Sequence, residues 1–197
     1  MISCILISAG LSQRFGSPKA LAPITATQTV LERTQEMLLH TKVSEVLVVL
    51  GHQSARLKPF LLNHKDIKVV YNNHYNFGQT SSVKAGLKCV SPQADAVLLL
   101  PVDYPVICGE TINALVDQME SSAPPIIVPT YEGMKGHPPL FSKQCFDEIL
   151  TLDNELGLNE ILHRHQSQLC LHPVDDKGVL RSFNTVEEFE QIKKDFI

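Results

Sequence analysis

The stretch ISCILISAGLSQRFGSPK, residues 2–19, decides the fold. Its first part, Ile2–Ser8, is a continuous apolar run rich in isoleucine, which predicts a buried β-strand. Its second part, residues 9–19, holds two glycines and two cationic side chains, which predicts a tight loop that can approach an anion. A strand that runs directly into such a loop is typical of an α/β protein with its ligand site at the carboxyl end of the strand.

Short apolar runs and longer amphipathic segments alternate along the first two thirds of the chain. We expect strands at 2–8, 46–50, 67–71, 94–100 and 126–128. We expect helices at 29–40, 55–62, 79–90 and 111–119. This alternation implies βαβ units, and hence an α/β fold with a mostly parallel sheet and helices on both of its faces.

The last third of the chain is less regular. We expect a strand at 140–141 and helices at 144–151, 158–163 and 186–194. Because no linker separates this part from the rest, we predict one domain over residues 1–197. Ligands of such sheets bind beyond the carboxyl ends of the strands, so a site is expected in the loops after residues 8, 50, 71 and 100.

The composition excludes several classes of protein. The 197 residues carry 17 Lys and Arg against 21 Asp and Glu, a formal charge of −4, whereas a general nucleic-acid binder has a basic surplus. No apolar run approaches the roughly 20 residues of a membrane span, so no membrane partner is expected. The five cysteines are odd in number and form no CxxC pair, which argues against a disulfide framework or a zinc site. We expect Cys4 and Cys89 to be core residues, and the N-terminus, without a basic leader region, indicates a cytoplasmic protein.

The loop at residues 8–19 has the chemistry of a polyphosphate site. Arg14 offers a planar fork for phosphate oxygens, Lys19 a compact positive charge and Ser12 a hydroxyl. A Walker A motif is excluded, because five residues separate Gly10 from Gly16 where the motif has four, and no Lys-Ser or Lys-Thr follows. The dinucleotide fingerprint G-x-G-x-x-G is absent as well. An ordinary glycine turn with solvated charges is the alternative interpretation.

The same loop resembles the signature L-x-A-G-x-S-x-R-(F/M)-G-x-P-K of the MobA-like nucleotidyltransferases, and the resemblance extends through most of the chain. It implies a Rossmann-like three-layer sandwich, the nucleotide-diphospho-sugar transferase fold. It also implies an enzyme that transfers NMP from an NTP to a phosphate acceptor and releases pyrophosphate, with Arg14 and Lys19 as catalytic residues. By matching position, the nucleotide-binding residues of this loop would be Ser8, Ala9, Gly10, Leu11, Ser12, Arg14 and Lys19.

A single carboxylate follows the strand expected at 94–100. Asp103 lies in LLLPVDYP, residues 98–105, between prolines that restrict its backbone. Such a carboxylate can hold Mg²⁺, which takes one or two carboxylates together with substrate phosphates. A local turn cap is the alternative. The segment resembles the family's L-x-x-D-x-P metal turn, which implies that Asp103 is a catalytic residue and binds Mg²⁺.

A polar helix start is expected in NHYNFGQTSSVKAGL, residues 73–87. Free N–H groups and hydroxyls at a helix start can contact a base, and a simple polar cap, which is common, is the alternative. The segment resembles G-x-x-x-S-(L/V)-x-x-G-(L/I) of cytidylyltransferases, which implies that Ser82 and Gln79 contact the nucleotide. Guanylyltransferases of the family typically have A-G-G in the first loop and G-P-L-x-G-(I/L) here. The resemblance therefore favours CTP over GTP.

Two further segments bear on the acceptor and the metal. GMKGHPPLF, residues 133–141, resembles the G-H-P motif of the same branch, which implies that His137 lies on the acceptor side; a loop histidine held by a backbone carbonyl is the alternative. SFNTVEEF, residues 182–189, departs from the family's D-(I/V)-D-T-P-E-(D/E), because both aspartates are replaced. Asn184 could give Mg²⁺ a carbonyl oxygen without charge, or it could cap the closing helix.

Three functions are compatible with these observations. The resemblance favours a molybdenum cofactor cytidylyltransferase, which uses CTP, Mg²⁺ and molybdopterin and passes its product to a molybdoenzyme. The same chemistry with GTP, or on a sugar phosphate or alcohol phosphate, is the nearest alternative. The weakened segment around Asn184 motivates a third, a chaperone that binds a nucleotide or cofactor without catalysis.

Overall fold

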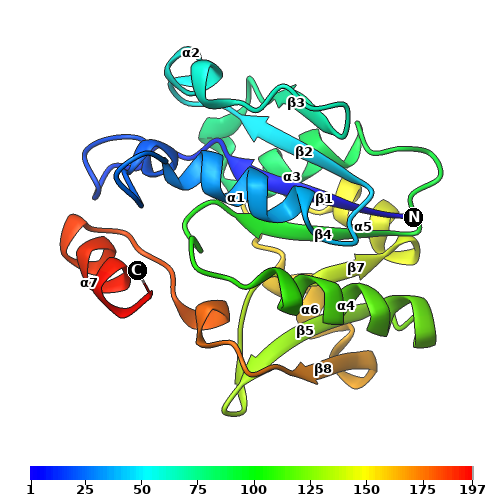
Figure 1. Ribbon diagram of the computed structural model, residues 1–197. Coiled ribbons are helices and arrows are strands. Elements are labelled where there is room, and N and C mark those ends of the chain that lie inside the picture. The colour runs from blue at the N-terminus through cyan, green and yellow to red at the C-terminus, as the bar shows by residue number, and fades with distance from the viewer. Residues whose placement is uncertain (197) are drawn as a thin grey trace.

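The computed structural model describes residues 1–196, in which eight strands form one mixed sheet between two layers of helices (Figure 1). The strand order is β3-β2-β1-β4-β7-β5-β6, and β8 pairs with β5. Four parallel strands lie side by side in the first half of the sheet: β1 (Ile2–Ser8), β2 (Glu45–Leu50), β3 (Ile67–Tyr71) and β4 (Ala96–Pro101). They match the ranges expected from the sequence to within two residues.

The second half of the sheet does not follow the alternation of parallel strands and helices that the sequence predicts. β7 (Leu140–Ser142) lies between β4 and β5 (Ile126–Tyr131) and is antiparallel to both, so β5 keeps the direction of β4. The sequence does not predict β6 (Met134–Lys135) or β8 (Leu169–Pro173), which pair with β5. β8 was missed because its side chains are half-buried or exposed and show no continuous apolar run.

The helices form two layers, as Figure 1 shows. One layer holds α1 (Val30–Leu39) and α4 (Gly109–Ser122), and α7 (Val186–Phe196) joins it beside the first loop. The other layer holds α3 (Gln79–Leu87), α5 (Phe146–Thr151) and α6 (Asn159–Arg164). Alternate residues of each central strand face opposite layers, which confirms the predicted α/β sandwich. The short α2 (Ser54–Leu57) follows β2, and the expected helix at 55–62 continues from it only as a 3-10 turn.

Local contacts explain where two of these helices begin and end. Thr29 precedes α1 and caps it, because its hydroxyl accepts from Glu32 N while the Glu32 carboxylate accepts from Thr29 N. At α3, a Cβ on Gly86 would lie 2.8 Å from Ile5 Cγ2, so glycine allows this helix to approach β1. α3 ends at Leu87 rather than at residue 90, and Cys89 beyond it is exposed. The prediction that Cys89 is a core residue was wrong, whereas Cys4 is fully buried.

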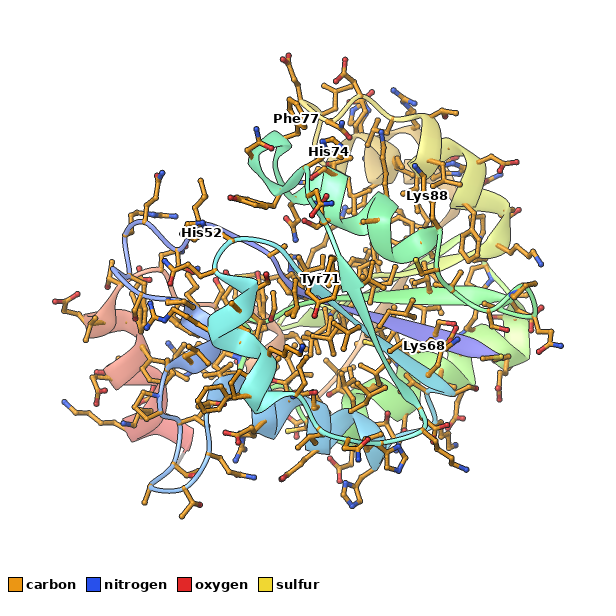
Figure 2. The ribbon with its side chains drawn as sticks, turned by 90° about the horizontal axis from the view of Figure 1, so that it is seen from above. His52, Lys68, Tyr71, His74, Phe77 and Lys88 are labelled. Atoms are coloured by element: carbon orange, nitrogen blue, oxygen red, sulfur yellow. The ribbon has the colours of Figure 1, made fainter. Side chains whose placement is uncertain are left out.

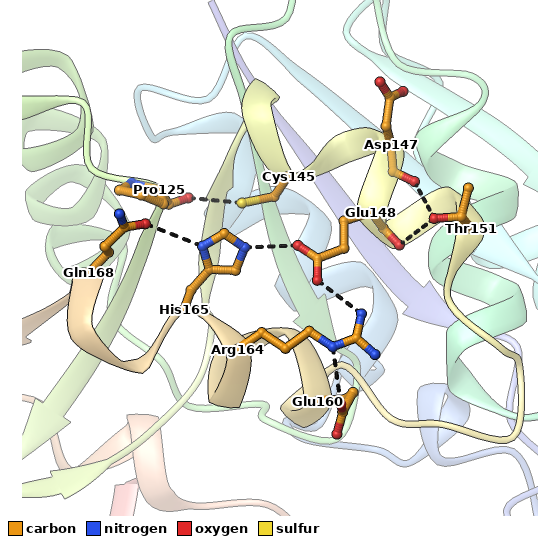
Figure 3. A network of polar contacts seen from close by, with 9 residues as sticks. All are labelled: Pro125, Cys145, Asp147, Glu148, Thr151, Glu160, Arg164, His165 and Gln168. Atoms are coloured by element: carbon orange, nitrogen blue, oxygen red, sulfur yellow. Dashed lines mark hydrogen bonds and ion pairs between the residues drawn. The ribbon is translucent and has the colours of Figure 1, made fainter.

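A cluster of charged side chains joins α5 to α6 (Figure 3). The Glu148 carboxylate is bound by His165 Nε2 at 2.8 Å and by Arg164 Nη1 at 3.1 Å, and Arg164 Nε donates to Glu160 at 3.0 Å. The hydrogen bond with His165 is the largest cause that lowers the pKa of Glu148. Helices of six residues are marginal by themselves, so these contacts and the apolar packing hold them. Within residues 1–196, no helix is long and apolar enough to cross a membrane.

Candidate active site

A cavity of about 550 Å³ opens at the carboxyl edge of the four parallel strands. Its walls come from the loops that follow β1, β2, β3 and β4, the loops in which a site is expected, together with His137 and the segment before α7. Every site residue predicted from the sequence lines it: Ser8, Ala9, Gly10, Leu11, Ser12, Arg14, Lys19, Gln79, Ser82, Asp103, His137 and Asn184. The strand order places the start of α3 at one end, His137 at the other, and the first loop between them.

Four of these residues form a connected polar cluster. Lys19 Nζ donates to Asp103 Oδ2 at 2.8 Å and to Asn184 Oδ1 at 3.0 Å. Arg14 Nη2 donates to the same Asn184 oxygen at 2.9 Å. Two cations and one carboxylate therefore meet around a neutral amide, so the cluster carries one net positive charge. This arrangement suits a polyanion that brings its own divalent cation.

The first loop is held in shape from both sides. Two residues of the loop have left-handed backbone conformations: Gly16 with φ +79° and Ser12 with φ +52°. Gly10, the other glycine of the loop, has no positive φ. Ser12 Oγ accepts from Lys19 N at 3.2 Å and closes the base of the loop. Phe15 packs edge-on against the Phe183 ring at 5.3 Å between centroids, and it contacts α7 as well. Arg14 and Lys19 therefore belong to a loop that is held in place by the packing of Phe15 against Phe183 and α7.

The alternative role of Asn184 as a helix cap was wrong. Thr185 caps α7, because its hydroxyl accepts from Glu188 N at 3.3 Å and the Glu188 carboxylate accepts from Thr185 N at 3.2 Å. The Asn184 backbone N–H donates to that carboxylate too, at 2.5 Å. Its side-chain oxygen is left to face Arg14 and Lys19 in the cavity.

At the α3 end, hydroxyl groups line the cavity. Ser82 is 2% exposed, and its Oγ accepts from the side-chain amide of Asn72 at 3.0 Å. Nearer the middle of the cavity, at the end of β1, Ser8 Oγ is buried and has no hydrogen-bond partner within residues 1–196. A Cβ on Gly51 would lie 2.6 Å from Tyr75 Cβ and 2.8 Å from Ala9 O, so glycine lets three loops meet here.

At the opposite end, the His137 ring stacks on Tyr104 with 4.4 Å between ring centroids. Burial lowers the pKa of His137, and the Asp103 carboxylate opposes this only in part. Burial likewise raises the pKa of Tyr104. Both rings are therefore neutral near pH 7 and form a flat aromatic wall. Within residues 1–196, no backbone carbonyl is hydrogen-bonded to the His137 ring, so the alternative of a histidine held by a carbonyl applies only to its backbone N–H, which donates to Val179 O at 2.9 Å.

Sequence reasoning missed several residues that line the cavity. Tyr104 and Ser182 adjoin residues that it did identify, whereas His52 and Tyr75 carry no motif and come from the loops after β2 and β3. In Figure 2, Tyr71 marks the outer strand, and His74 and Phe77 mark the loop that leads from it into α3. The tilted contact of His52 with Tyr75, 5.7 Å between ring centroids, joins two of these loops.

The oxygen donors of the cavity fit a hard divalent cation that is shared with a substrate. In the part of the chain that the structure describes, no group of three or more His, Cys, Asp or Glu could hold a metal by itself. The cavity offers the Asp103 carboxylate and the Asn184 carbonyl oxygen, both of which are ligand types that Mg²⁺ accepts. Most ligands of the cation would then be phosphate oxygens and water.

A family model described as the MobA-like NTP transferase domain matches residues 4–169. The chain belongs to this family. It is therefore a member of a nucleotidyltransferase family, and the cavity lies where the strand order of an α/β sheet places a nucleotide site.

Curated relatives of this MobA-like NTP transferase include enzymes of molybdenum cofactor synthesis. The molybdenum cofactor cytidylyltransferase of Escherichia coli K12 is 28% identical over 161 residues, which cover 82% of this chain and 80% of that protein. A probable molybdenum cofactor guanylyltransferase of Bacillus cereus is also 28% identical, over 97% of this chain and 95% of that protein. Relatives named for either nucleotide are thus equally similar.

Solved structures confirm the fold. The crystal structure of Rv0371c from Mycobacterium tuberculosis superposes with a TM-score of 0.86 at 24% identity, and covers 98% of this chain and 97% of that one. The same protein in complex with manganese gives a TM-score of 0.81, also at 24% identity, with 98% of both chains covered.

Proposed function

We propose that this MobA-like NTP transferase moves CMP from CTP to molybdopterin and releases pyrophosphate. The observation that carries the proposal is the cluster of Arg14, Lys19 and Asp103 in a cavity that has a hydroxyl-lined end and an aromatic end. One end suits a nucleoside, the middle a triphosphate with its cation, and the other end a flat acceptor. The segment at residues 78–87, which resembles that of cytidylyltransferases and not that of guanylyltransferases, supports the choice of CTP.

Binding of the triphosphate would exchange partners within the cluster. Arg14 and Lys19 now donate to Asn184 and Asp103, and phosphate oxygens would take the place of these acceptors. Phosphate oxygens carry negative charge that the neutral Asn184 amide lacks, which favours the exchange for both cations. The Asp103 carboxylate, released from Lys19, would then face the cation that accompanies the triphosphate.

Mg²⁺ would be held by Asp103, with the carbonyl oxygen of Asn184 as a weaker neutral ligand. When bound, the ion supplies positive charge that offsets the negative charge developing on the transferred phosphoryl group. The manganese complex of the mycobacterial neighbour is consistent with a divalent ion in this fold.

The transfer itself needs no nucleophilic side chain. A phosphate oxygen of the acceptor attacks the α-phosphorus in line, the new P–O bond forms, and the bond to the bridging oxygen of the leaving pyrophosphate breaks. Arg14 and Lys19 neutralise the charge that accumulates on the pyrophosphate. Positioning and electrostatics therefore provide the catalysis, and no covalent enzyme intermediate forms.

The aromatic wall favours a flat acceptor such as a pterin. Tyr104 and His137 stack with their ring planes 23° apart, so a heteroaromatic ring can lie against them. Because burial keeps His137 neutral near pH 7, one of its ring nitrogens can accept a hydrogen bond from the acceptor. The proposal has three further parts. The protein is cytoplasmic, residues 1–197 act as one domain, and a molybdoenzyme receives the product.

Two measurements test this function. Thermal unfolding with each of the four NTPs, with and without Mg²⁺, should show the largest stabilisation by CTP; a ligand at 100 times its Kd adds about 2.7 kcal/mol. Pyrophosphate release should require CTP, Mg²⁺ and molybdopterin together. Stronger stabilisation by GTP would assign the chain to the guanylyl branch, and turnover only with a sugar or alcohol phosphate would replace the acceptor. Tight CTP binding without turnover on any acceptor would favour a non-catalytic carrier.

A further inference from the structure

Asn72 lies directly after β3, and its side-chain amide binds two serines of α3. Its Nδ2 donates to Ser81 Oγ at 2.9 Å and to Ser82 Oγ at 3.0 Å, while only 5% of Asn72 is exposed. In the chain, Asn72 follows Tyr71, which marks the outer strand in Figure 2. Both hydrogens of the amide are therefore used, one on each serine.

A backbone group fixes the orientation of this amide. The Asn72 Oδ1 accepts from His74 N at 2.9 Å. Because a backbone N–H can only donate, the atom that faces it must be the amide oxygen, and the amide nitrogen must face the serines. The amide cannot flip without placing two donors against each other.

The two serine hydroxyls differ in whether their own protons have a hydrogen-bond acceptor. Ser81 Oγ lies 2.9 Å from His74 O and 2.7 Å from Gly78 O, so its proton is taken up by a backbone carbonyl. Ser82 Oγ accepts from Asn72, and no acceptor for its own proton is found within the described residues. Ser82 lines the main cavity, whereas Ser81 lines a separate hollow of about 310 Å³ beside α3.

We propose that Asn72 is a positioning residue that makes the Ser82 hydroxyl a hydrogen-bond donor to the nucleobase. Since the Ser82 oxygen already accepts from Asn72 and no acceptor in the described part of the chain takes its proton, that proton is left for an acceptor on a ligand in the cavity that Ser82 lines. A base that presents a carbonyl oxygen or an unprotonated ring nitrogen there is matched, and a base that presents an N–H is not. The inference rests on the proposed function and adds a determinant of nucleotide choice outside the phosphate-binding loop.

The variants that test this differ in one hydrogen-bonding property each. Asn72→Asp keeps the shape of the side chain and the acceptor for His74 N, but its carboxylate accepts protons from the serines instead of donating to them. Ser82→Ala removes the hydroxyl that faces the cavity. Ser81→Ala is the matched control, because it removes a hydroxyl that is also buried and binds the same amide but lines the separate hollow and not the main cavity.

Equilibrium binding of two probes separates a role toward the base from a role in folding. Tripolyphosphate contains the phosphates without the base, and CTP contains both. Ser82→Ala and Asn72→Asp should each weaken CTP binding about tenfold, and the double variant no more than either alone, because Asn72 acts through Ser82. Tripolyphosphate binding should stay unchanged in all of them, and Ser81→Ala should leave both affinities unchanged.

Equal losses for CTP and tripolyphosphate, or losses that multiply in the double variant, would overturn the inference. If Asn72→Asp does not fold, as shown by its thermal unfolding, Asn72→Ala takes its place in the same cycle. If the wild-type protein prefers another NTP, that nucleotide replaces CTP in the measurements. A wild-type protein that binds no NTP more tightly than tripolyphosphate would contradict both the proposed function and this inference. A wild-type protein that binds CTP, combined with losses of affinity that multiply in the double variant, would contradict only the inference.

Discussion

Lys19 Nζ lies 2.8 Å from Asp103 Oδ2, although the two residues are 84 positions apart in the chain. The ion pair joins the loop after β1 to the turn after β4, which are neighbouring strands of the sheet. Only 13% of the Lys19 side chain and 25% of the Asp103 side chain are exposed. Each of these two charges therefore has a partner of opposite sign. When a triphosphate binds with its divalent cation, Lys19 can pair with the phosphates and Asp103 with the cation, so that neither charge is left unpaired.

Replacing either cation of the first loop should weaken nucleotide binding. Hydrogen bonds to charged groups contribute about 1.5–3 kcal/mol, so Lys19→Ala and Arg14→Ala should each raise the Kd for CTP roughly ten- to a hundredfold and slow transfer. Lys42→Ala is the matched control, because Lys42 is paired with Asp117 on the surface. Isothermal titration and steady-state kinetics measure the two effects. Unchanged Kd and kcat in both loop variants would show that the loop is only a turn.

Removing the Asp103 carboxylate should separate binding from transfer. Asp103→Asn keeps the shape of the side chain but removes the charge that attracts the metal, so pyrophosphate release should be lost. CTP binding measured without Mg²⁺ should be retained, because the loop contacts phosphates directly and Lys19 loses a competing partner. Asp117→Asn, at a surface ion pair, is the control. Near-normal turnover of Asp103→Asn would contradict the metal role.

The sequence predicts the parallel half of the sheet and the residues around the cavity, and physical reasons limit the rest. Buried parallel strands read as continuous apolar runs, so β1 to β4 are predicted closely. The reversed direction of β7 is not encoded in its three buried residues, two apolar and one serine, because burial on both faces gives no sign of direction. Asn72 was not identified either, because its role depends on contacts with Ser81 and Ser82 that only the packing of β3 against α3 creates.

The stability contributed by Glu148 should depend on pH. Its carboxylate binds Arg164 and His165 in the folded state, and its pKa is lowered below the ordinary value of 4.5. A carboxylate with a lowered pKa stabilises the fold above the ordinary value, and this stabilisation is lost as the pH falls through the folded pKa. Glu148→Gln should therefore lower Tm by roughly 2–4 °C at pH 7, for a loss of about 1 kcal/mol.

Thermal unfolding of Glu148→Gln at a series of pH values checks this. The difference in Tm from the wild-type protein should shrink as the pH falls from 4.5 through the lowered folded pKa of Glu148, because below that pKa the Glu148 carboxyl and the amide that replaces it in the variant are both neutral. Glu160→Gln serves as the control, because Glu160 binds only the Arg164 side of the cluster and should have a smaller effect. A difference that is constant across the pH range would mean that shape, not charge, is responsible.

Asn184 is the position at which a single added charge is most informative. Its Oδ1 accepts from both Arg14 and Lys19, so a carboxylate there would pair with the two cations and compete with phosphate when no metal is present. Once a divalent cation is present, the same carboxylate would be a second charged ligand beside Asp103. Asn184→Asp should therefore weaken CTP binding without metal and lower the Mg²⁺ concentration that gives half-maximal transfer.

The two expected effects of Asn184→Asp have opposite signs, which distinguishes a metal ligand from a residue that only orders the loop. A residue that only orders Arg14 and Lys19 should weaken CTP binding equally with and without Mg²⁺. Asn184→Ala is the matched control, because it removes the acceptor for both cations without adding a charge. Mg²⁺ titrations of transfer by the three proteins decide between the roles. Superimposable curves for the wild-type protein and Asn184→Asp would leave Asp103 as the protein's metal ligand and Asn184 as a support for the two cations.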